Sequence, residues 1–149
     1  MPTSKTVPRD RAAFTHFVPV TLRYSDQDPM GHVNNVAITA LLESGRMGFL
    51  WHLFRDAPLP TRGMVLARLS VDYLNEILLP EPVEVGGRLA RIGGRSITTQ
   101  YAVFQGTTCC VVSESVNVFF DPETRKSAEP QGEIAVLLER LAGEMKQGG

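Results

Sequence analysis

The chain has 149 residues and a net charge of −1, from 15 basic and 16 acidic side chains. Its hydrophobic fraction of 43% and its length suit one ordinary globular domain with its own core. Without a basic excess, binding to nucleic acid is not expected. Residues 1–15 contain no apolar stretch, so we expect neither a signal peptide nor a membrane span there, but a flexible leader before a single domain over residues 16–149.

The only two cysteines are adjacent, Cys109 and Cys110, in an apolar run. Neighbouring residues on a strand point to opposite faces, so we expect two reduced structural thiols and not a disulfide. This favours a cytoplasmic protein. Two thiols alone are also too few ligands for a metal ion, and no metal site is expected.

The first strand is expected over residues 16–24, where every second residue from Val18 to Tyr24 is apolar. Pro19 lies inside this stretch. Because proline cannot donate a hydrogen bond to a neighbouring strand, we expect this strand at an edge of the sheet.

A long helix is expected over residues 36–54, after a segment rich in turn formers. Either Asn34 or Asn35 can cap its N-terminus. The helix is apolar on most of its circumference, which predicts that it is largely buried. Gly45 and Gly48 lower its helix propensity, and a close approach to a sheet or a second helix would explain them.

The rest of the chain is typical of antiparallel strands followed by a short helix. Strands are expected over residues 65–79, 83–92, 96–105 and 108–120, and an amphipathic helix over residues 134–145. The turns between the strands are short, which favours antiparallel neighbours. One helix covers only one face of a five-stranded sheet, and long strands leave open edges, so we expect a homo-oligomer.

Asp28 lies on the turn before the long helix, facing the helix start. The first N–H groups of a helix have no intrahelical partner and lie at the positive end of its dipole. A carboxylate opposite such groups suits acyl transfer, because it can attack a carbonyl or activate water while the N–H groups stabilise an oxyanion. The sequence leaves both roles of the carboxylate open.

A specific string spans this turn and the helix: Tyr24-x-Asp26-x-Asp28-x-x-Gly31-His32-Val33-Asn34-Asn35, with Glu43-x-x-Arg46 further along. It resembles the hotdog-fold acyl-CoA thioesterases of the 4-hydroxybenzoyl-CoA thioesterase type. The resemblance implies an α+β fold in which a five-stranded antiparallel sheet wraps a long central helix, here with a C-terminal helix. It also implies active sites at the interface of a homodimer or homotetramer, an acyl-CoA substrate, and no cofactor beyond the coenzyme A of the substrate. No membrane partner is expected.

By this resemblance Asp28 matches the catalytic aspartate, and the backbone N–H of Asn35 matches the oxyanion donor. His32 has two interpretations: a structural hydrogen-bonding group, which we favour, and a general base. Asn34 is expected to be a cap more than a substrate ligand. Asp26 supports the loop and has no chemical role.

Further residues are candidates for substrate binding. Glu43 can pair with Arg46, or it can orient the substrate, since the family places a carboxylate at this position near the cavity. The phosphates of coenzyme A favour arginine, whose planar fork binds them bidentately. Three arginines flank the Gly93–Gly94 turn and are either phosphate ligands or a solvated rim: Arg88, Arg91 and Arg95. Ser96 matches a small hydroxyl residue that similar enzymes often have near the pantetheine arm.

The leading interpretation is hydrolysis of an acyl-CoA thioester to a carboxylic acid and free coenzyme A. A hotdog dehydratase ranks lower, because His32 and Asp28 are too close in sequence for the arrangement of that branch. A non-catalytic acyl-CoA or lipid-binding module stays open. The sequence also leaves open which acyl group is hydrolysed, and whether acyl carrier protein takes the place of coenzyme A.

Overall fold

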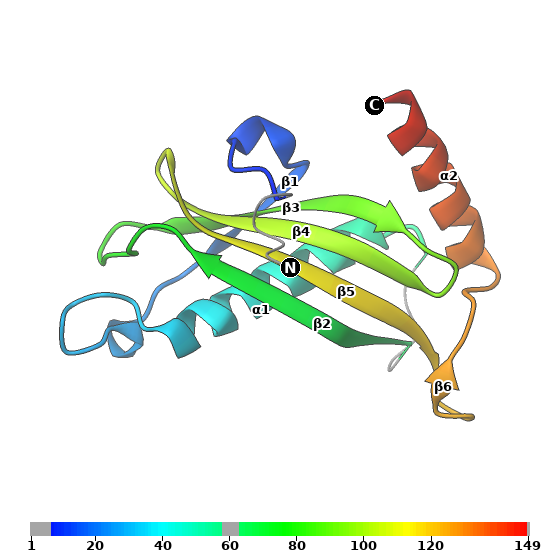
Figure 1. The fold of residues 1–149 in the computed structure, drawn as a ribbon, viewed down its shortest axis with the longest axis horizontal. Coiled ribbons are helices and arrows are strands. Elements are labelled where there is room, and N and C mark those ends of the chain that lie inside the picture. Colours follow the sequence, from blue (N-terminus) through cyan, green and yellow to red (C-terminus); the bar gives the residue numbers. More distant parts are fainter. Residues whose placement is uncertain (1–6, 58–62, 149) are drawn as a thin grey trace.

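The structure is a computed structural model and describes residues 7–57 and 63–148. Its sheet is antiparallel, in the order β1-β3-β4-β5-β2, and consists of β1 (His16–Val20), β2 (Met64–Tyr73), β3 (Val83–Ile92), β4 (Ser96–Gln105) and β5 (Thr108–Asp121). A short β6 (Lys126–Ser127) pairs with β5. The long helix α1 (Asn35–Leu53) runs along one face of the sheet, and α2 (Glu133–Gln147) lies at one end (Figure 1). This is the α+β architecture that the sequence predicts.

Helix α1 packs closely against β1 and β3. A Cβ added at Gly45 would lie 2.5 Å from Cβ of Val85, and one at Gly48 would lie 2.9 Å from the side chain of Val18. Only residues without a side chain permit this approach. Close packing against the sheet therefore explains the helix glycines, as predicted.

Three groups of buried side chains form the core. Between α1 and the sheet lie, among others, Leu42, Phe49, Val85, Tyr101, Val103 and Val111. Under α2 lie Leu50, Phe54, Ile97, Phe119, Leu137 and Leu138. A third group lies on the opposite face of the sheet, because side chains alternate along a strand, and contains Val7, Phe14, Ala102, Phe104 and Val112.

Residues 7–15 cover part of that opposite face. Phe14 is buried and packs edge to face on Phe104, with the ring centroids 5.8 Å apart. Arg11 bonds Glu84 at 3.0 Å. These residues thus belong to the packed part of the chain, which corrects the leader predicted over residues 1–15, whose first six lie outside the described residues. No local pattern indicates this packing, because the apolar residues here, such as Val7, show no regular spacing.

Two predicted strands are shorter than expected. β1 ends at Val20, and Tyr24 begins a short 3₁₀ helix (Tyr24–Asp26) and is 86% exposed. There the Asp26 carboxylate accepts the backbone N–H of Arg23 at 2.8 Å, which turns the chain away from the sheet. The prediction that Pro19 lies in an edge strand is confirmed, since β1 is one edge.

β2 ends at Tyr73, not at residue 79 as predicted. The N–H groups of Leu74 and Asn75 both donate to the same carbonyl oxygen, that of Cys110, at 2.8 and 3.0 Å. A regular ladder gives each carbonyl one such donor, so the pairing with β5 stops here. The chain beyond this point leaves the sheet and becomes a wall of the cavity described below.

The surface of α1 is only partly buried in the single chain. Val36 is 81% exposed and Trp51 is 71% exposed, so the prediction of a largely buried helix is wrong for the side of α1 that carries these residues.

Within the described ranges, neither helix has both the length and the apolarity needed to cross a bilayer. Cys109 and Cys110 are free thiols on β5, as predicted.

Candidate active site

The loop before α1 is closed by hydrogen bonds within its own backbone. The N–H of Asp28 donates to the carbonyl of His32 at 2.7 Å, and the N–H of Gly31 donates to the carbonyl of Asp28 at 3.0 Å. Gly31 has φ of 83°, in the left-handed region where glycine has no steric penalty. The loop is therefore a compact turn whose geometry its own residues determine.

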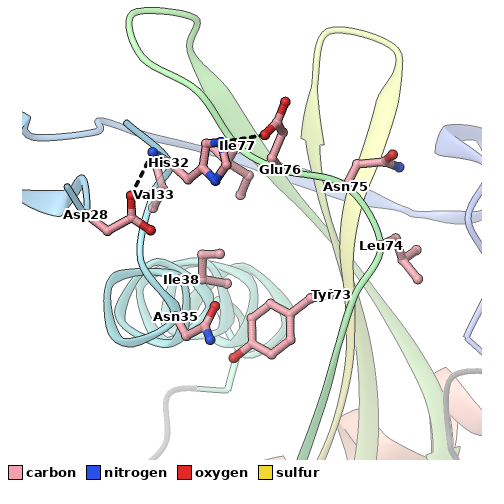
Figure 2. A pocket seen from close by; sticks show the side chains of 10 residues that line it. All are labelled: Asp28, His32, Val33, Asn35, Ile38, Tyr73, Leu74, Asn75, Glu76 and Ile77. Atoms are coloured by element: carbon pink, nitrogen blue, oxygen red, sulfur yellow. Dashed lines mark hydrogen bonds and ion pairs between the residues drawn. The ribbon is translucent and has the colours of Figure 1, made fainter. Parts of the chain in front are cut away.

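This turn fixes the side chain of Asp28. Its Oδ1 accepts the backbone N–H groups of Met30 at 2.8 Å and of His32 at 3.1 Å. Among the described residues, Oδ2 has no hydrogen-bond partner. Figure 2 shows the carboxylate between His32 and the first turn of α1. One oxygen thus holds the group in place and the other is available for chemistry.

Helix α1 begins beside this carboxylate. Asn34 is its N-cap: the side-chain oxygen accepts the N–H of Ala37 at 2.8 Å, and the side-chain amide donates to the carbonyl of Asp26 at 3.0 Å. The prediction of a cap is confirmed, and Asn34 is the residue that provides it. Asn35 is the first helical residue, and its backbone N–H has no partner in the described part of the chain.

Asp26 anchors the other end of the loop. It is 7% exposed and its carboxylate binds the Arg23 guanidinium at 2.9 Å. The Arg23 side chain thereby lowers the pKa of the Asp26 carboxyl below its usual value. A buried, paired carboxylate of this kind supports the loop, as predicted for Asp26.

A cavity of about 290 Å³ opens in front of these groups (Figure 2). One wall contains Asp28, His32, Asn35 and Ile38, and the other is the segment 73–77. The two walls are joined where the Val33 N–H donates to the carbonyl of Ile77 at 3.0 Å. The cavity therefore depends on β2 ending early, because only a segment free of the sheet can reach the loop.

Sequence reasoning missed two ionisable residues of this cavity, Tyr73 and Glu76, of which Glu76 pairs with His32. Its Oε2 lies 2.7 Å from Nε2 of His32 (Figure 2). The strand predicted over residues 65–79 includes Glu76 in its interior, where a single acidic residue indicates only a solvated face. Glu76 falls on the polar side of the strand alternation, together with Arg68 and Asp72, so no signal in the sequence distinguishes it.

Glu43 and Arg46 form a loose pair on α1, with their charged atoms 4.0 Å apart. The predicted pairing is present, but Glu43 does not line the cavity and its side chain is 70% exposed. Arg46, by contrast, is buried. An orienting role for Glu43 stays a prediction.

The residues proposed for the phosphates and the pantetheine arm lie elsewhere. The turn between β3 and β4 is at the end of the sheet near α2, away from the loop before α1 (Figure 1). Arg88 donates to Gln100 at 2.8 Å, and Arg95 contacts Ser127 at 3.5 Å. Within one chain, none of the four candidates lines the cavity with Asp28: Arg88, Arg91, Arg95 and Ser96. Their binding roles stay predictions.

No group of three or more His, Cys, Asp or Glu side chains within residues 7–57 and 63–148 is arranged to hold a metal ion. The chemistry that these residues offer is that of a fixed carboxylate, an imidazole paired with a second carboxylate, and the positive end of a helix. This combination suits attack on a carbonyl carbon and stabilisation of the resulting oxyanion.

Several known proteins are similar to this chain in sequence and fold. The family model of the thioesterase-like superfamily matches residues 22–140. A predicted thioesterase from Bacillus stearothermophilus is 30% identical, with a TM-score of 0.73 over 83% of this chain and 93% of that one. A thioesterase from Thermus thermophilus, solved with coenzyme A and Zn, is 28% identical, with a TM-score of 0.71 over 82% and 95%.

A relative among curated proteins is the uncharacterized protein YsmA of Bacillus subtilis (strain 168), 26% identical over 91 residues. That match covers 61% of this chain and 62% of YsmA, so it spans less than two thirds of that relative. Together the matches confirm the resemblance to hotdog-fold thioesterases and the fold it implied. The enzyme class expected from the sequence, a thioester hydrolase, is the class named for the solved relatives. The chain belongs to the thioesterase-like superfamily.

Proposed function

We propose that the protein hydrolyses acyl-CoA thioesters to a carboxylic acid and free coenzyme A, with Asp28 as the nucleophile. The observation that supports this most is that one cavity contains both a fixed carboxylate with a free oxygen and the unpaired N–H of Asn35, among the described residues. A binding module without chemistry would have no need for either group at this place.

In this mechanism Oδ2 of Asp28 attacks the thioester carbonyl carbon. The C–S bond breaks, coenzyme A leaves as the thiolate, and the acyl group is held as a mixed anhydride with Asp28. Water then attacks the anhydride, which releases the acid and restores the Asp28 carboxylate. The Asn35 N–H stabilises the oxyanion in both steps, helped by the positive end of the α1 dipole.

Coenzyme A as the carrier is supported by the Thermus thermophilus relative, which was solved with it. Acyl carrier protein is the alternative carrier. Coenzyme A belongs to the substrate, and no further cofactor is proposed. Location in the cytoplasm is supported by the two free thiols of Cys109 and Cys110.

We also propose that the protein works as a homo-oligomer. β2 is an edge of the sheet, and an unpaired edge favours pairing with a second chain. Val65 and Leu66 on β2 and Trp51 on α1 are exposed apolar residues that such an interface would cover. The arginines near the β3–β4 turn could then reach the substrate only from a partner chain.

The test is a hydrolysis assay with acetyl-, octanoyl-, palmitoyl- and benzoyl-CoA, in which the free thiol of the released coenzyme A is measured. Asp28→Asn should lower kcat by about 10³-fold or more, because it removes the nucleophile, while acyl-CoA binding is retained. Asp72→Asn is the control, since this β2 aspartate does not line the cavity. Unchanged turnover in Asp28→Asn would refute the mechanism, and binding without any hydrolysis by the wild type would favour the binding module.

A further inference from the structure

We infer that Glu76 is a positioning residue, and that it holds His32 as the general base for the water that attacks the acyl-Asp28 anhydride. The inference rests on the proposed function and extends it from the first step of the reaction to the second. It also changes the role of His32, which the sequence favoured as a structural group.

The backbone holds His32 and Glu76 in register with each other. His32 and Leu78 face each other in an isolated antiparallel bridge, and the neighbouring Val33 N–H donates to the carbonyl of Ile77 at 3.0 Å. The backbone N–H of His32 also donates to the Asp28 carboxylate. The 2.7 Å contact between the imidazole and Glu76 therefore joins two segments whose main chains are already fixed.

Stability does not account for this pair. The side chains of His32 and Glu76 are 44% and 55% exposed, and ion pairs this exposed contribute little to stability. Both residues nevertheless line the cavity that contains Asp28. A pair of little structural value at the entrance to a reactive carboxylate points to a role in chemistry.

The contact determines which ring nitrogen is basic. When Nε2–H donates to the Glu76 carboxylate, the neutral imidazole has its lone pair on Nδ1. Figure 2 shows this second nitrogen on the side of the ring that faces the cavity, and it has no hydrogen-bond partner among the described residues. The other ionisable side chains that line the cavity are Asp28, Glu76 and Tyr73.

In the hydrolytic step, Nδ1 of His32 takes one proton from water as the water oxygen bonds to the acyl carbon of the anhydride. The bond between that carbon and the Asp28 oxygen breaks, which yields the carboxylic acid and the free Asp28 carboxylate. The imidazolium, which faces the Glu76 carboxylate, then gives its proton to solvent, and solvent also protonates the thiolate released in the first step.

The experiment separates the two steps by rapid mixing of enzyme with the best acyl-CoA of the panel above and continuous detection of the free thiol. Glu76→Gln removes the charge and keeps the shape, and His32→Gln removes the base but leaves the backbone N–H that holds Asp28. Glu81→Gln is the matched control, because Glu81 is an exposed glutamate of the same connection between β2 and β3 and lies outside the cavity.

Both cavity variants should release about one equivalent of thiol per active site at the wild-type rate and then turn over slowly, because only hydrolysis of the anhydride is impaired. We expect kcat to fall about 10²-fold or more in His32→Gln and about 10-fold in Glu76→Gln, with partial recovery in Glu76→Asp. KM should fall along with kcat, and Glu81→Gln should match the wild type.

Two results would overturn the inference alone: wild-type turnover in Glu76→Gln, or an initial burst slowed as much as the steady state, which would indicate a purely structural effect on Asp28. The melting temperatures of both variants are measured as well, and a value equal to that of the wild type shows that a slowed burst does not come from misfolding. If the wild type hydrolyses none of the acyl-CoAs, the proposed function itself is refuted and the inference falls with it.

Discussion

Asn35 offers a direct test of the oxyanion site, because proline at this position removes the backbone N–H and little else. Asn35 is the first residue of α1, where proline is favoured in helices and where no helical hydrogen bond is lost. Asn34, which would precede the proline, has φ of −74° and ψ of 160°, an extended conformation that a following proline permits. Asn35→Pro should therefore fold normally.

The magnitude follows from the loss of one donor to the oxyanion. Removal of such a donor costs about 10²- to 10³-fold in kcat, which corresponds to about 3–4 kcal/mol of transition-state stabilisation. Asn35→Ala retains the N–H and removes an exposed side chain, so we expect it to keep kcat within about threefold of the wild type. The melting temperature of Asn35→Pro should stay equal to that of the wild type or rise slightly.

The assay compares kcat of both variants for one acyl-CoA, with circular dichroism to confirm the helix content. Equal kcat in Asn35→Pro and Asn35→Ala would refute the reasoning, because the backbone N–H would then have no part in catalysis. A low kcat in both variants would instead assign the effect to the side chain.

Two further predictions concern stability. Gly45→Ala should lower the melting temperature by about 4–8 °C, because contact with Val85 at 2.5 Å costs about 3 kcal/mol against about 1 kcal/mol gained in helix propensity. Gly143→Ala in α2 is the control and should raise the melting temperature, because nothing lies within 4 Å of the added Cβ. Equal shifts in the two variants would contradict the packing argument. Burial lowers the pKa of His52 from 6.5, and electrostatic interactions with His16 and Arg55 lower it further, so the folded state resists protonation of His52. This group should leave stability unchanged above about pH 6.5 and reduce it as the pH falls to the lower folded pKa, and urea titrations should show a weaker pH dependence in His52→Gln.

The loop before α1 could be predicted from sequence because its contacts are local. Asp28, Gly31 and the cap Asn34 lie within one short stretch, and each forms its hydrogen bonds with residues a few positions away. Turn formers and caps have the same preferences in most proteins, so their order in the chain is informative. The bounds of α1, β3, β4 and β5 were predictable for a similar reason, since they are set by turn formers close by in the sequence, such as Gly93–Gly94 and Gly106.

Two of the errors concern positions where distant segments meet. The predicted β2 is too long because its end is set by two N–H groups that share the carbonyl of Cys110, which no pattern within β2 reveals. The predicted leader includes Val7 and Phe14 because the surface that buries them belongs to β4 and β5. In both cases the deciding contact is with a strand far along the chain.

By itself the sequence determined the local chemistry: a carboxylate held by its own turn, next to the start of a capped helix. Only the tertiary structure decided what surrounds that carboxylate. It brought Glu76 to His32, opened the cavity between two segments, and left the arginines of the β3–β4 turn at the other end of the sheet. The physical reason is that backbone hydrogen bonds and caps act over a few residues, whereas the approach of side chains from separate strands depends on how the whole sheet packs on α1.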